Sequence, residues 1–140
     1  TLSTWRLDNG TPKFGDDVSF TINGIGNHTV KLVVENGFGC KDSVSKKINI
    51  VPVKADFTVN KNDVCAGTEI KFNNSSTGNN LKYLWDFGDG TTSSDFEPIH
   101  VFASERNYTI KLKVSDGTGC EDNMVKNSFV RIKKRAIIFS

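Results

Sequence analysis

The segment Tyr83–Thr91, with the sequence YLWDFGDGT, decides how the rest of this chain folds. Trp85 and the aromatic residues two positions to either side of it alternate with other residues, which is the period of a strand with one buried face. Asp89-Gly90 follows at once, and this dipeptide is favoured where a tight turn needs a positive φ. The segment therefore predicts a strand that carries a central tryptophan and ends in a turn.

A second copy of this pattern lies 80 residues earlier in the chain. From Trp5 to Val44, one offset of 80 aligns the two stretches without a gap, and 12 of those 40 positions are identical. Chance gives only a few identities over such a length, so the two stretches are copies of one unit. The shared residues that we expect to shape each copy are Trp5 and Trp85, Gly10 and Gly90, and Gly37 and Gly117.

Each copy has the pattern of an all-β protein. Apolar side chains fall at every second position in Tyr108–Val114, and the first copy repeats this alternation in His28–Val34. Residues 56–59 and 68–72 predict earlier strands in the second copy, and nothing shows the 3.6-residue period of a helix. Short strands at about ten-residue spacing, separated by Asn-Gly and Asp-Gly turns, predict an antiparallel sandwich of two sheets.

The repeat also predicts how the chain divides. Residues 53–132 form a complete copy, whereas residues 1–52 correspond only to the C-terminal part of one, because its opening half has no counterpart. We expect the first copy to have an open edge and an incomplete core, and to be protected from exchange only when something covers it. Residues 133–140 are expected to be a linker or the start of a following unit.

Three segments of the second copy resemble the motifs of one known family. Tyr83–Thr91 resembles the W-D-F-G-D-G signature of PKD domains, which are immunoglobulin-like modules. Pro98–Phe102 is similar to the family's Pro-x-His-x-Tyr/Phe stretch, and Asn107–Leu112 to its G-x-Y-x-V-x-L strand. The resemblance covers nearly all of residues 55–132. It implies tandem immunoglobulin-like antiparallel β-sandwiches of the PKD type, the first truncated on its N-terminal side.

The first copy resembles the signature less closely. Residues 6–9 read Arg-Leu-Asp-Asn where residues 86–89 read Asp-Phe-Gly-Asp, whereas Trp5 and Gly10 are kept. The core aromatic residue and the turn glycine therefore persist while the carboxylates vary. This difference favours an architectural role for the motif over a chemical one.

Two further segments place the chain in a biological setting by resemblance. Cys65–Phe72 and Gly117–Asp122 resemble PKD repeats in very long surface and secreted proteins of gliding bacteria. Such proteins are often adhesins or exported enzymes with modular stalks. The resemblance implies a cell-surface or extracellular location, with gliding motility and type IX secretion as the associated context.

The three cysteines test the extracellular assignment. Cys65 precedes an early strand of the second copy and Cys120 follows its hairpin turn, so we predict that they meet across the sandwich as a structural disulfide. Cys40, the counterpart of Cys120, is predicted to be unpaired. A zinc site is disfavoured because the chain has no Cys-x-x-Cys and only two histidines, His28 and His100.

The sequence contains one candidate site for a metal ion. Asp86 and Asp89, together with Asp95 or Glu97, could bind Ca²⁺ through carboxylate oxygens. The favoured interpretation is that Asp89 serves its Gly90 turn and that Asp86 accepts backbone hydrogen bonds, so no metal or other cofactor is expected.

No catalytic residues are predicted, and the chain is not expected to be an enzyme. His28 and His100 fall at inward or family-typical strand positions, and we expect both to be packing residues rather than parts of a nucleophilic triad. The sequence contains neither a phosphate-binding loop nor a His-Glu-x-x-His motif.

The charge and hydropathy of the chain exclude two classes of partner. Its 18 basic and 16 acidic residues are interspersed and give a net charge of +2, so no strong field attracts nucleic acid. No apolar run approaches the roughly 20 residues that span a bilayer. The expected partners are neighbouring modules of the same parent chain, and surface proteins or polysaccharides.

Three functions remain open at this point. The first is a structural spacer and interaction module of a large cell-surface or secreted protein, with rigid domains joined by a short linker near Val51–Val53. The second is a module that adheres directly or binds carbohydrate or protein. The third is an accessory module of a secreted hydrolase whose catalytic domain lies elsewhere.

Overall fold

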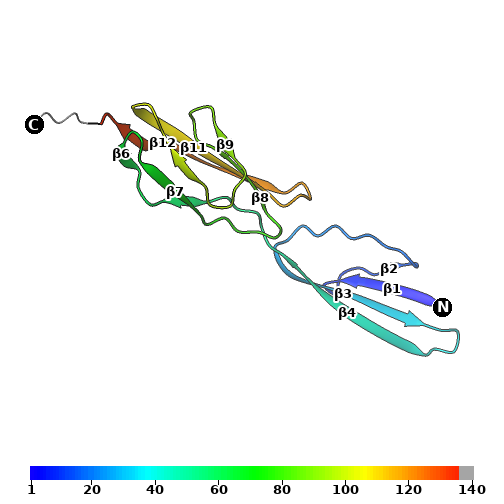
Figure 1. The fold of residues 1–140 in the computed structure, drawn as a ribbon. Coiled ribbons are helices and arrows are strands. Elements are labelled where there is room, and N and C mark those ends of the chain that lie inside the picture. Colours follow the sequence, from blue (N-terminus) through cyan, green and yellow to red (C-terminus); the bar gives the residue numbers. More distant parts are fainter. Residues whose placement is uncertain (136–140) are drawn as a thin grey trace, which may run out of the picture. The chain divides into compact units, whose positions relative to one another are not determined.

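The computed structural model describes residues 1–135 and builds them from β-strands, with no helix among them. The absence of helix in this part of the chain confirms the all-β prediction. The strands belong to two compact units, Thr1–Val51 and a second that begins at Pro52. Figure 1 labels most of the strands of both units.

Unit 1 is a single antiparallel sheet. Its strands are β1 (Leu2–Leu7), β2 (Lys13–Phe14), β3 (Gly26–Glu35) and β4 (Lys41–Ile50), in the order β2-β1-β3-β4. The two long strands β3 and β4 form a hairpin that is paired along its whole length (Figure 1). No side chain of unit 1 is fully buried, because no second sheet packs against either face of this one.

Unit 2 contains two sheets of different size. The larger has the order β6-β12-β11-β8-β9, and the smaller has the order β10-β7-β5. The strands of unit 2 are β5 (Phe57–Val59), β6 (Asp63–Cys65), β7 (Glu69–Asn74), β8 (Lys82–Asp86), β9 (Thr92–Ser93), β10 (Ile99–Val101), β11 (Arg106–Ser115) and β12 (Glu121–Lys133).

The core of unit 2 lies between its two sheets and is centred on Trp85, which is fully buried. The Trp85 ring packs against Phe57 and Phe72 of the smaller sheet, with centroid distances of 5.2 and 5.5 Å. Its indole Nε1 donates a hydrogen bond of 2.9 Å to the Asp95 carbonyl, so the buried N–H is satisfied. The buried apolar side chains are Ala55, Phe57, Ile70, Phe72, Trp85, Phe87, Phe102, Tyr108, Ile110, Leu112, Val114, Val130 and Ile132.

The four strands of unit 1 repeat the register of β8, β9, β11 and β12. In unit 1, Leu32 pairs with Trp5 on one side and with Val44 on the other. In unit 2, residues 80 positions later have the same pairing, with Leu112 between Trp85 and Met124. The two indoles also bond equivalent carbonyls, since Trp5 Nε1 donates to Gly15 and Trp85 Nε1 to Asp95.

Two features of unit 2 have no equivalent in unit 1. Strand β12 contains a bulge opposite Tyr108–Ile110, with Ser128 at φ 47°, whereas the β3–β4 ladder is regular. The smaller sheet is the second feature. Residues 19–21 are the counterparts of β10, which lies 80 positions later. They form no strand, because unit 1 has no equivalent of β7, the strand with which β10 pairs.

The turns correct one prediction about glycine. Gly90 and Gly117 have positive φ values of 88° and 80°, as expected of these turns. Gly10 does not, because Asp8 and Asn9 take the left-handed conformation (φ 48° and 59°) and Gly10 donates its N–H to the Leu7 carbonyl.

Gly37 also lacks a positive φ. In the turn after β3, the left-handed residue is Gly39, at φ 81°. A short asparagine or aspartate side chain tolerates this conformation, so an Asx-Gly dipeptide does not by itself fix which residue adopts it.

The C-terminal strand brings two distant segments together. β12 runs parallel to β6, and Lys133 lies opposite Cys65. Of the predicted linker 133–140, residues 136–140 lie outside the described residues. In residues 1–135 there is no helix that could cross a membrane.

Candidate functional site

The signature residues Asp86 and Asp89 lie at the turn between β8 and β9 and use their carboxylates to hold it. Asp86 Oδ1 accepts the Gly88 N–H at 2.9 Å, and Asp89 Oδ1 accepts the Thr91 N–H at 3.0 Å. The Thr91 hydroxyl donates to the same Asp89 oxygen. These are short-range bonds of the kind that Asx residues form in turns.

The remaining oxygen of Asp89 binds His100 of β10. The Asp89 Oδ2 to His100 Nε2 distance is 2.7 Å, and the two side chains are only 20% and 17% exposed. The His100 ring also stacks on Phe87, with centroids 4.0 Å apart. Partial burial acts to raise the pKa of Asp89, but the hydrogen bonds from Thr91 and His100 outweigh it and lower that pKa.

Gly88 is the residue of the signature for which no side chain is tolerated. It has φ +77°, and a Cβ built on it would lie 2.6 Å from the Thr109 carbonyl oxygen of β11. Arg106 Nη2 donates to the Gly88 carbonyl at 2.7 Å, and the Arg106 guanidinium lies over the Tyr108 ring. The signature turn is thus held against β11 by close backbone contact.

The candidate calcium ligands Asp86, Asp89 and Asp95 form hydrogen bonds with neighbouring groups. Asp95 interacts with the hydroxyl of Ser93, and Asp86 and Asp89 spend an oxygen each on backbone amides. Among residues 1–135 no three His, Cys, Asp or Glu side chains form a group that could hold a metal ion.

Unit 1 contains a second aspartate–histidine pair that the sequence analysis missed. His28 Nδ1 lies 2.5 Å from Asp8 Oδ2, and His28 Nε2 lies 3.1 Å from the Gly24 carbonyl. Asp8 Oδ1 accepts the Thr29 N–H at 2.7 Å. The hydrogen bond that His28 donates to Asp8 lowers the pKa of Asp8 and raises the pKa of His28.

A positional signal could have revealed this pair. Tyr108, the counterpart of His28, donates its hydroxyl to the carbonyl of Ser104, and His28 bonds Gly24, which is also four residues upstream. The prediction that both histidines only pack was therefore incomplete, because each one also binds a carboxylate. A histidine that replaces a tyrosine at a strand start needs a polar partner.

Neither pair has the geometry of a catalytic triad. A triad needs the acid on one ring nitrogen and the nucleophile on the other. His100 Nε2 contacts both Asp89 and the Thr91 hydroxyl, at 2.7 and 3.4 Å, so acid and hydroxyl share one nitrogen. Both nitrogens of His28 are engaged by Asp8 and Gly24.

The predicted disulfide is wrong. Cys65 lies opposite Lys133 at the end of β12, whereas Cys120 immediately precedes Glu121, with which β12 begins. A strand of 13 residues spans about 40 Å, far beyond the roughly 7 Å over which two Cα atoms can be bridged. Cys40, Cys65 and Cys120 are all free and exposed. The sequence did not show that β6 pairs with the far end of β12.

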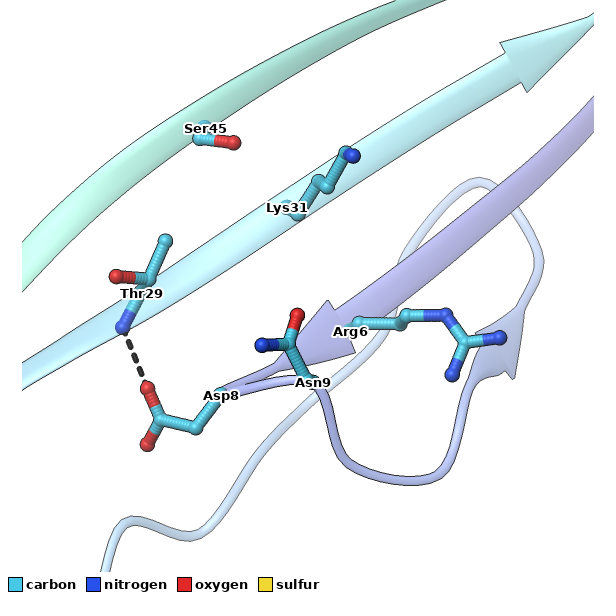
Figure 2. A pocket seen from close by; sticks show the side chains of 6 residues that line it. All are labelled: Arg6, Asp8, Asn9, Thr29, Lys31 and Ser45. Carbon is cyan, nitrogen blue, oxygen red and sulfur yellow. Dashed lines mark hydrogen bonds between the residues drawn. The ribbon is translucent and has the colours of Figure 1, made fainter.

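A polar pocket lies on one face of the unit 1 sheet. It has a volume of about 330 Å³ and is lined by Arg6, Asp8, Asn9, Thr29, Lys31 and Ser45. Figure 2 shows the Asp8 carboxylate bonded to the Thr29 N–H, with Lys31 on the neighbouring part of β3. Besides the Asp8 carboxylate, which is engaged by Thr29 and His28, two cations, two hydroxyls and an amide could contact an anionic or hydroxyl-rich ligand here.

The other face of unit 1 is apolar and uncovered. A hollow of about 450 Å³ lies over β1, β3 and β4, lined by Trp5, Val30, Leu32, Val44, Lys46, Lys47 and Ile48. Val44 is 54% exposed and Ile48 is 39% exposed. In unit 2 the corresponding face is covered by the smaller sheet.

The comparisons with known proteins agree with this architecture. A sequence profile described as "PKD domain" matches residues 50–132, which is more than half of the chain. The chain belongs to the PKD domain family. The match covers the whole closed sandwich of unit 2, including the PKD signature turn and the strands on both sides of it.

Curated relatives of this PKD chain include large proteases. Collagenase ColA of Bacillus cereus is 40% identical over 75 residues, which are 49% of this chain and 8% of that protein. Collagenase ColA of Clostridium perfringens is 29% identical over 109 residues, 73% of this chain and 9% of that protein. Pre-pro-metalloprotease PrtV of Vibrio cholerae is 40% identical over 47 residues, 34% of this chain and 5% of that protein. The chain thus spans less than a tenth of each.

Two solved structures are also similar to the chain. The PKD1 domain of Vibrio anguillarum Epp has 25% identity and a TM-score of 0.49, covering 59% of this chain and 96% of that one. The amphioxus IgVJ-C2 molecule has 11% identity and a TM-score of 0.49, covering 92% of this chain and 87% of that one.

Proposed function

We propose that this protein is a non-catalytic spacer and interaction module of a large extracellular or cell-surface protein. Residues 53–132 act as one complete PKD module, and residues 1–52 as the C-terminal part of a second module in tandem with it. The observation that carries the proposal is the repeated register, in which Leu32 and Leu112 sit between equivalent partners in the two units. A spacer built from repeats needs this architecture and no reactive groups.

The polar residues support a structural role. Asp86, Asp89 and His100 form hydrogen bonds that fix the signature turn. The related segments occupy less than a tenth of each protease named above, which suits a module that accompanies another domain. The likeness to these collagenases and to the metalloprotease supports the extracellular part of the proposal.

Surface exposure is the direct test of the location. Protease treatment of intact cells that carry the parent protein should remove an epitope on unit 2, while a cytoplasmic control protein stays intact. Protection of the epitope until the cells are lysed would contradict the extracellular assignment. The link to gliding motility and type IX secretion rests on sequence resemblance alone, and loss of export in a type IX mutant would support it.

A second candidate function is direct binding of an acidic polysaccharide. The pocket of Figure 2 favours it, because Arg6 and Lys31 line one hollow together with the hydroxyls of Thr29 and Ser45. Carboxylate or sulfate groups of the polysaccharide would be the ligands of the two cations. In unit 2 the position of Arg6 is taken by Asp86, so only unit 1 has this pair of cations.

Binding measurements on the whole chain separate spacer from adhesin. For a spacer, a uronate-containing polysaccharide, a sulfated one and a neutral one all give no saturable signal. For an adhesin, the acidic polysaccharides bind saturably, R6A and K31A weaken that binding about tenfold each, and K111A at the matching position of unit 2 does not. Calcium binding to Asp86 and Asp89 is the minor proposal, and a rise in the melting temperature with added Ca²⁺ would support it.

The third candidate is an accessory role beside a secreted hydrolase. The collagenases and the metalloprotease among the relatives favour it. If the parent protein contains such a catalytic domain, deletion of residues 1–132 should reduce its activity on insoluble substrate and leave its activity on a short soluble peptide unchanged. Equal loss on both substrates would indicate that the deletion only unfolds the enzyme.

A further inference from the structure

We propose that the uncovered apolar face of unit 1 is the docking surface for a polypeptide segment with the chemistry of residues 53–81, which supply β5 and β7 to unit 2. That chemistry is a small residue followed by Asp and Phe on one strand, and an Ile-x-Phe strand beside it. The inference rests on the proposed module equivalence and names the partner that this face accepts.

The floor of the docking surface matches a face that is known to be covered. Trp5, Leu32 and Val44 lie side by side across β1, β3 and β4. Their counterparts Trp85 and Leu112 are fully buried, under Phe57 of β5 and Phe72 of β7. The hollow of about 450 Å³ in unit 1 is the space that such aromatic side chains would fill.

In unit 2, two charged residues at the edge of the corresponding face bind the segment that covers it. In unit 2, Asp122 Oδ2 accepts the Ala55 N–H at 2.9 Å. Lys126 donates to the Phe57 carbonyl, and its Nζ lies 3.7 Å from Asp56 Oδ1. The segment Ala55–Phe57 is therefore held by one acceptor and one donor as well as by its aromatic ring.

Unit 1 presents the same two charges at the same register. Asp42 pairs with Val34 as Asp122 pairs with Val114, and Lys46 pairs with Val30. Within residues 1–135 neither Asp42 nor Lys46 forms an ion pair. A strand with a backbone N–H, a carboxylate and an aromatic ring at successive positions complements this arrangement.

A second copy of the chain is a poorer occupant. The segment with the required chemistry is present in this chain at β5 and β7, where Phe57 and Phe72 are fully buried. Offering it to another molecule would expose two large aromatic side chains that unit 2 keeps out of water. Residues 53–81 of a second copy are therefore not the expected occupant.

The arrival of the segment would also order part of unit 1. Residues 19–21 are the counterpart of β10, which pairs with β7 through Ile99–Lys71 and the two pairs beside it. These residues form no strand in unit 1. Once a strand equivalent to β7 is present, we expect them to pair with it and complete the three-stranded sheet.

The test adds a synthetic peptide with the sequence of residues 53–81 to the whole chain. We expect saturable binding at one peptide per chain, a blue shift of tryptophan emission because Trp5 becomes buried, and slower amide exchange in β1, β3 and β4. L32D should abolish all three changes. V33D is the matched control, because Val33 pairs with Thr4 and Ser43 on the opposite face, and it should bind normally.

Two peptide variants and a fusion protein complete the test. Replacing Phe57 in the peptide by Ala should weaken binding at least a hundredfold, and replacing Asp56 by Asn about fivefold. Fusing residues 53–81 directly before Leu2 should give unit 1 a cooperative unfolding transition that L32D removes, even if the free peptide aggregates. If neither peptide binding nor this unfolding transition is observed, the inference is overturned.

The remaining outcomes are also decisive. Self-association of the chain that L32D abolishes, without peptide binding, would identify a second copy as the occupant and overturn the proposal. These readouts concern unit 1 alone, so their failure leaves surface exposure of the parent protein untouched. Failure of surface exposure would in turn not affect peptide binding.

Discussion

The two units have four equivalent strands, in the same register as far as the β12 bulge, yet only unit 2 has a closed core. Thirteen apolar side chains are buried in unit 2, and none is fully buried in unit 1. The difference is the smaller sheet β10-β7-β5, which covers Trp85 and has no counterpart over Trp5. The comparison teaches that hairpin pairing fixes the register, whereas burial depends on a second layer.

The energetic consequence is a large difference in stability between the units. Each large side chain that is fully buried contributes roughly 1.5–3 kcal/mol. Unit 1 relies on backbone ladders and half-exposed side chains, and a single sheet of this kind is marginal without a cover. The predictions that follow compare matched residues of the two units, beginning with the largest effect.

Replacing the central tryptophan separates the units most clearly. W85A should destabilise unit 2 by about 3–5 kcal/mol, because it leaves a cavity among Phe57, Phe72 and the larger sheet. W5A should change the stability of unit 1 by less than about 1 kcal/mol, because no second layer packs on Trp5. Urea unfolding followed by unit-specific amide signals measures both. Equal effects would show that unit 1 has a closed core in solution.

The signature glycine provides the second comparison. G88A should destabilise unit 2 by about 2–4 kcal/mol, since its Cβ would meet the Thr109 carbonyl oxygen and its φ is +77°. G90A is the matched control, because its φ is +88° but no atom lies within 4 Å of the added Cβ, so only about 1 kcal/mol is expected. Thermal unfolding of the two variants should therefore differ, and identical melting temperatures would contradict the close contact at Gly88.

The third comparison concerns Asp122 and Asp42, the equivalent carboxylates at the sheet edge. D122A should cost about 1–3 kcal/mol, because it leaves the N–H of fully buried Ala55 without its acceptor. D42A should be close to neutral, because the equivalent donor strand is not present in unit 1. D122N keeps an acceptor and should recover most of the loss in chemical denaturation. A loss in D122N as large as in D122A would assign the effect to charge.

A smaller effect is expected at the tyrosine of β11. Y108F removes the 2.8 Å hydrogen bond to the Ser104 carbonyl but keeps the buried ring, so unit 2 should lose about 1 kcal/mol. Chemical denaturation measures the change. Replacing His28 by Phe should not affect unit 2, and any effect there would show that the two units unfold together.

The smallest effect is a pH dependence confined to unit 1. The raised pKa of His28 means that its contribution is present below the ordinary value of 6.5 and is lost as the pH rises through the raised pKa. The lowered pKa of Asp8 means that its contribution is present above 3.8 and is lost as the pH falls through the lowered pKa. The pair therefore stabilises unit 1 most between pH 3.8 and 6.5.

Amide exchange at Thr29 reports this dependence, because its N–H donates to Asp8. The protection factor should be highest in that pH window and should decrease at neutral pH. H28Q removes the titrating group and should flatten the profile above pH 6.5. A profile that keeps its shape in H28Q would assign the pH dependence to other groups.

Much of the fold could be predicted because it depends on local signals. Alternation of apolar residues predicted the strands around Trp85 and Leu112, and the offset of 80 residues pointed to units that share one register. The signature turn could be assigned to architecture, because a carboxylate next to a turn glycine has backbone amides within reach. None of these inferences needs knowledge of contacts between distant strands.

The errors and omissions all involve such distant contacts. The parallel pairing of β6 with the end of β12 separates Cys65 from Cys120, and no local pattern in either segment shows it. The Asp8–His28 and Asp89–His100 pairs join residues 20 and 11 positions apart, on different elements. The glycine turns are the local exception, because the strands that flank Gly37 and Gly117 are paired alike and only Gly117 has a positive φ.

The sequence by itself determined that this protein is all-β, that residues 5–44 align with residues 85–124 at one offset and that both tryptophans belong to strands. These properties follow from the period of side chains along a strand, which is a short-range effect. Only the tertiary structure decided which tryptophan is buried, that Cys65 lies far from Cys120, and which charged residues lie at the edge of an uncovered face. Those properties depend on which strands become neighbours across a sandwich, and packing between layers is set by contacts far apart in the chain.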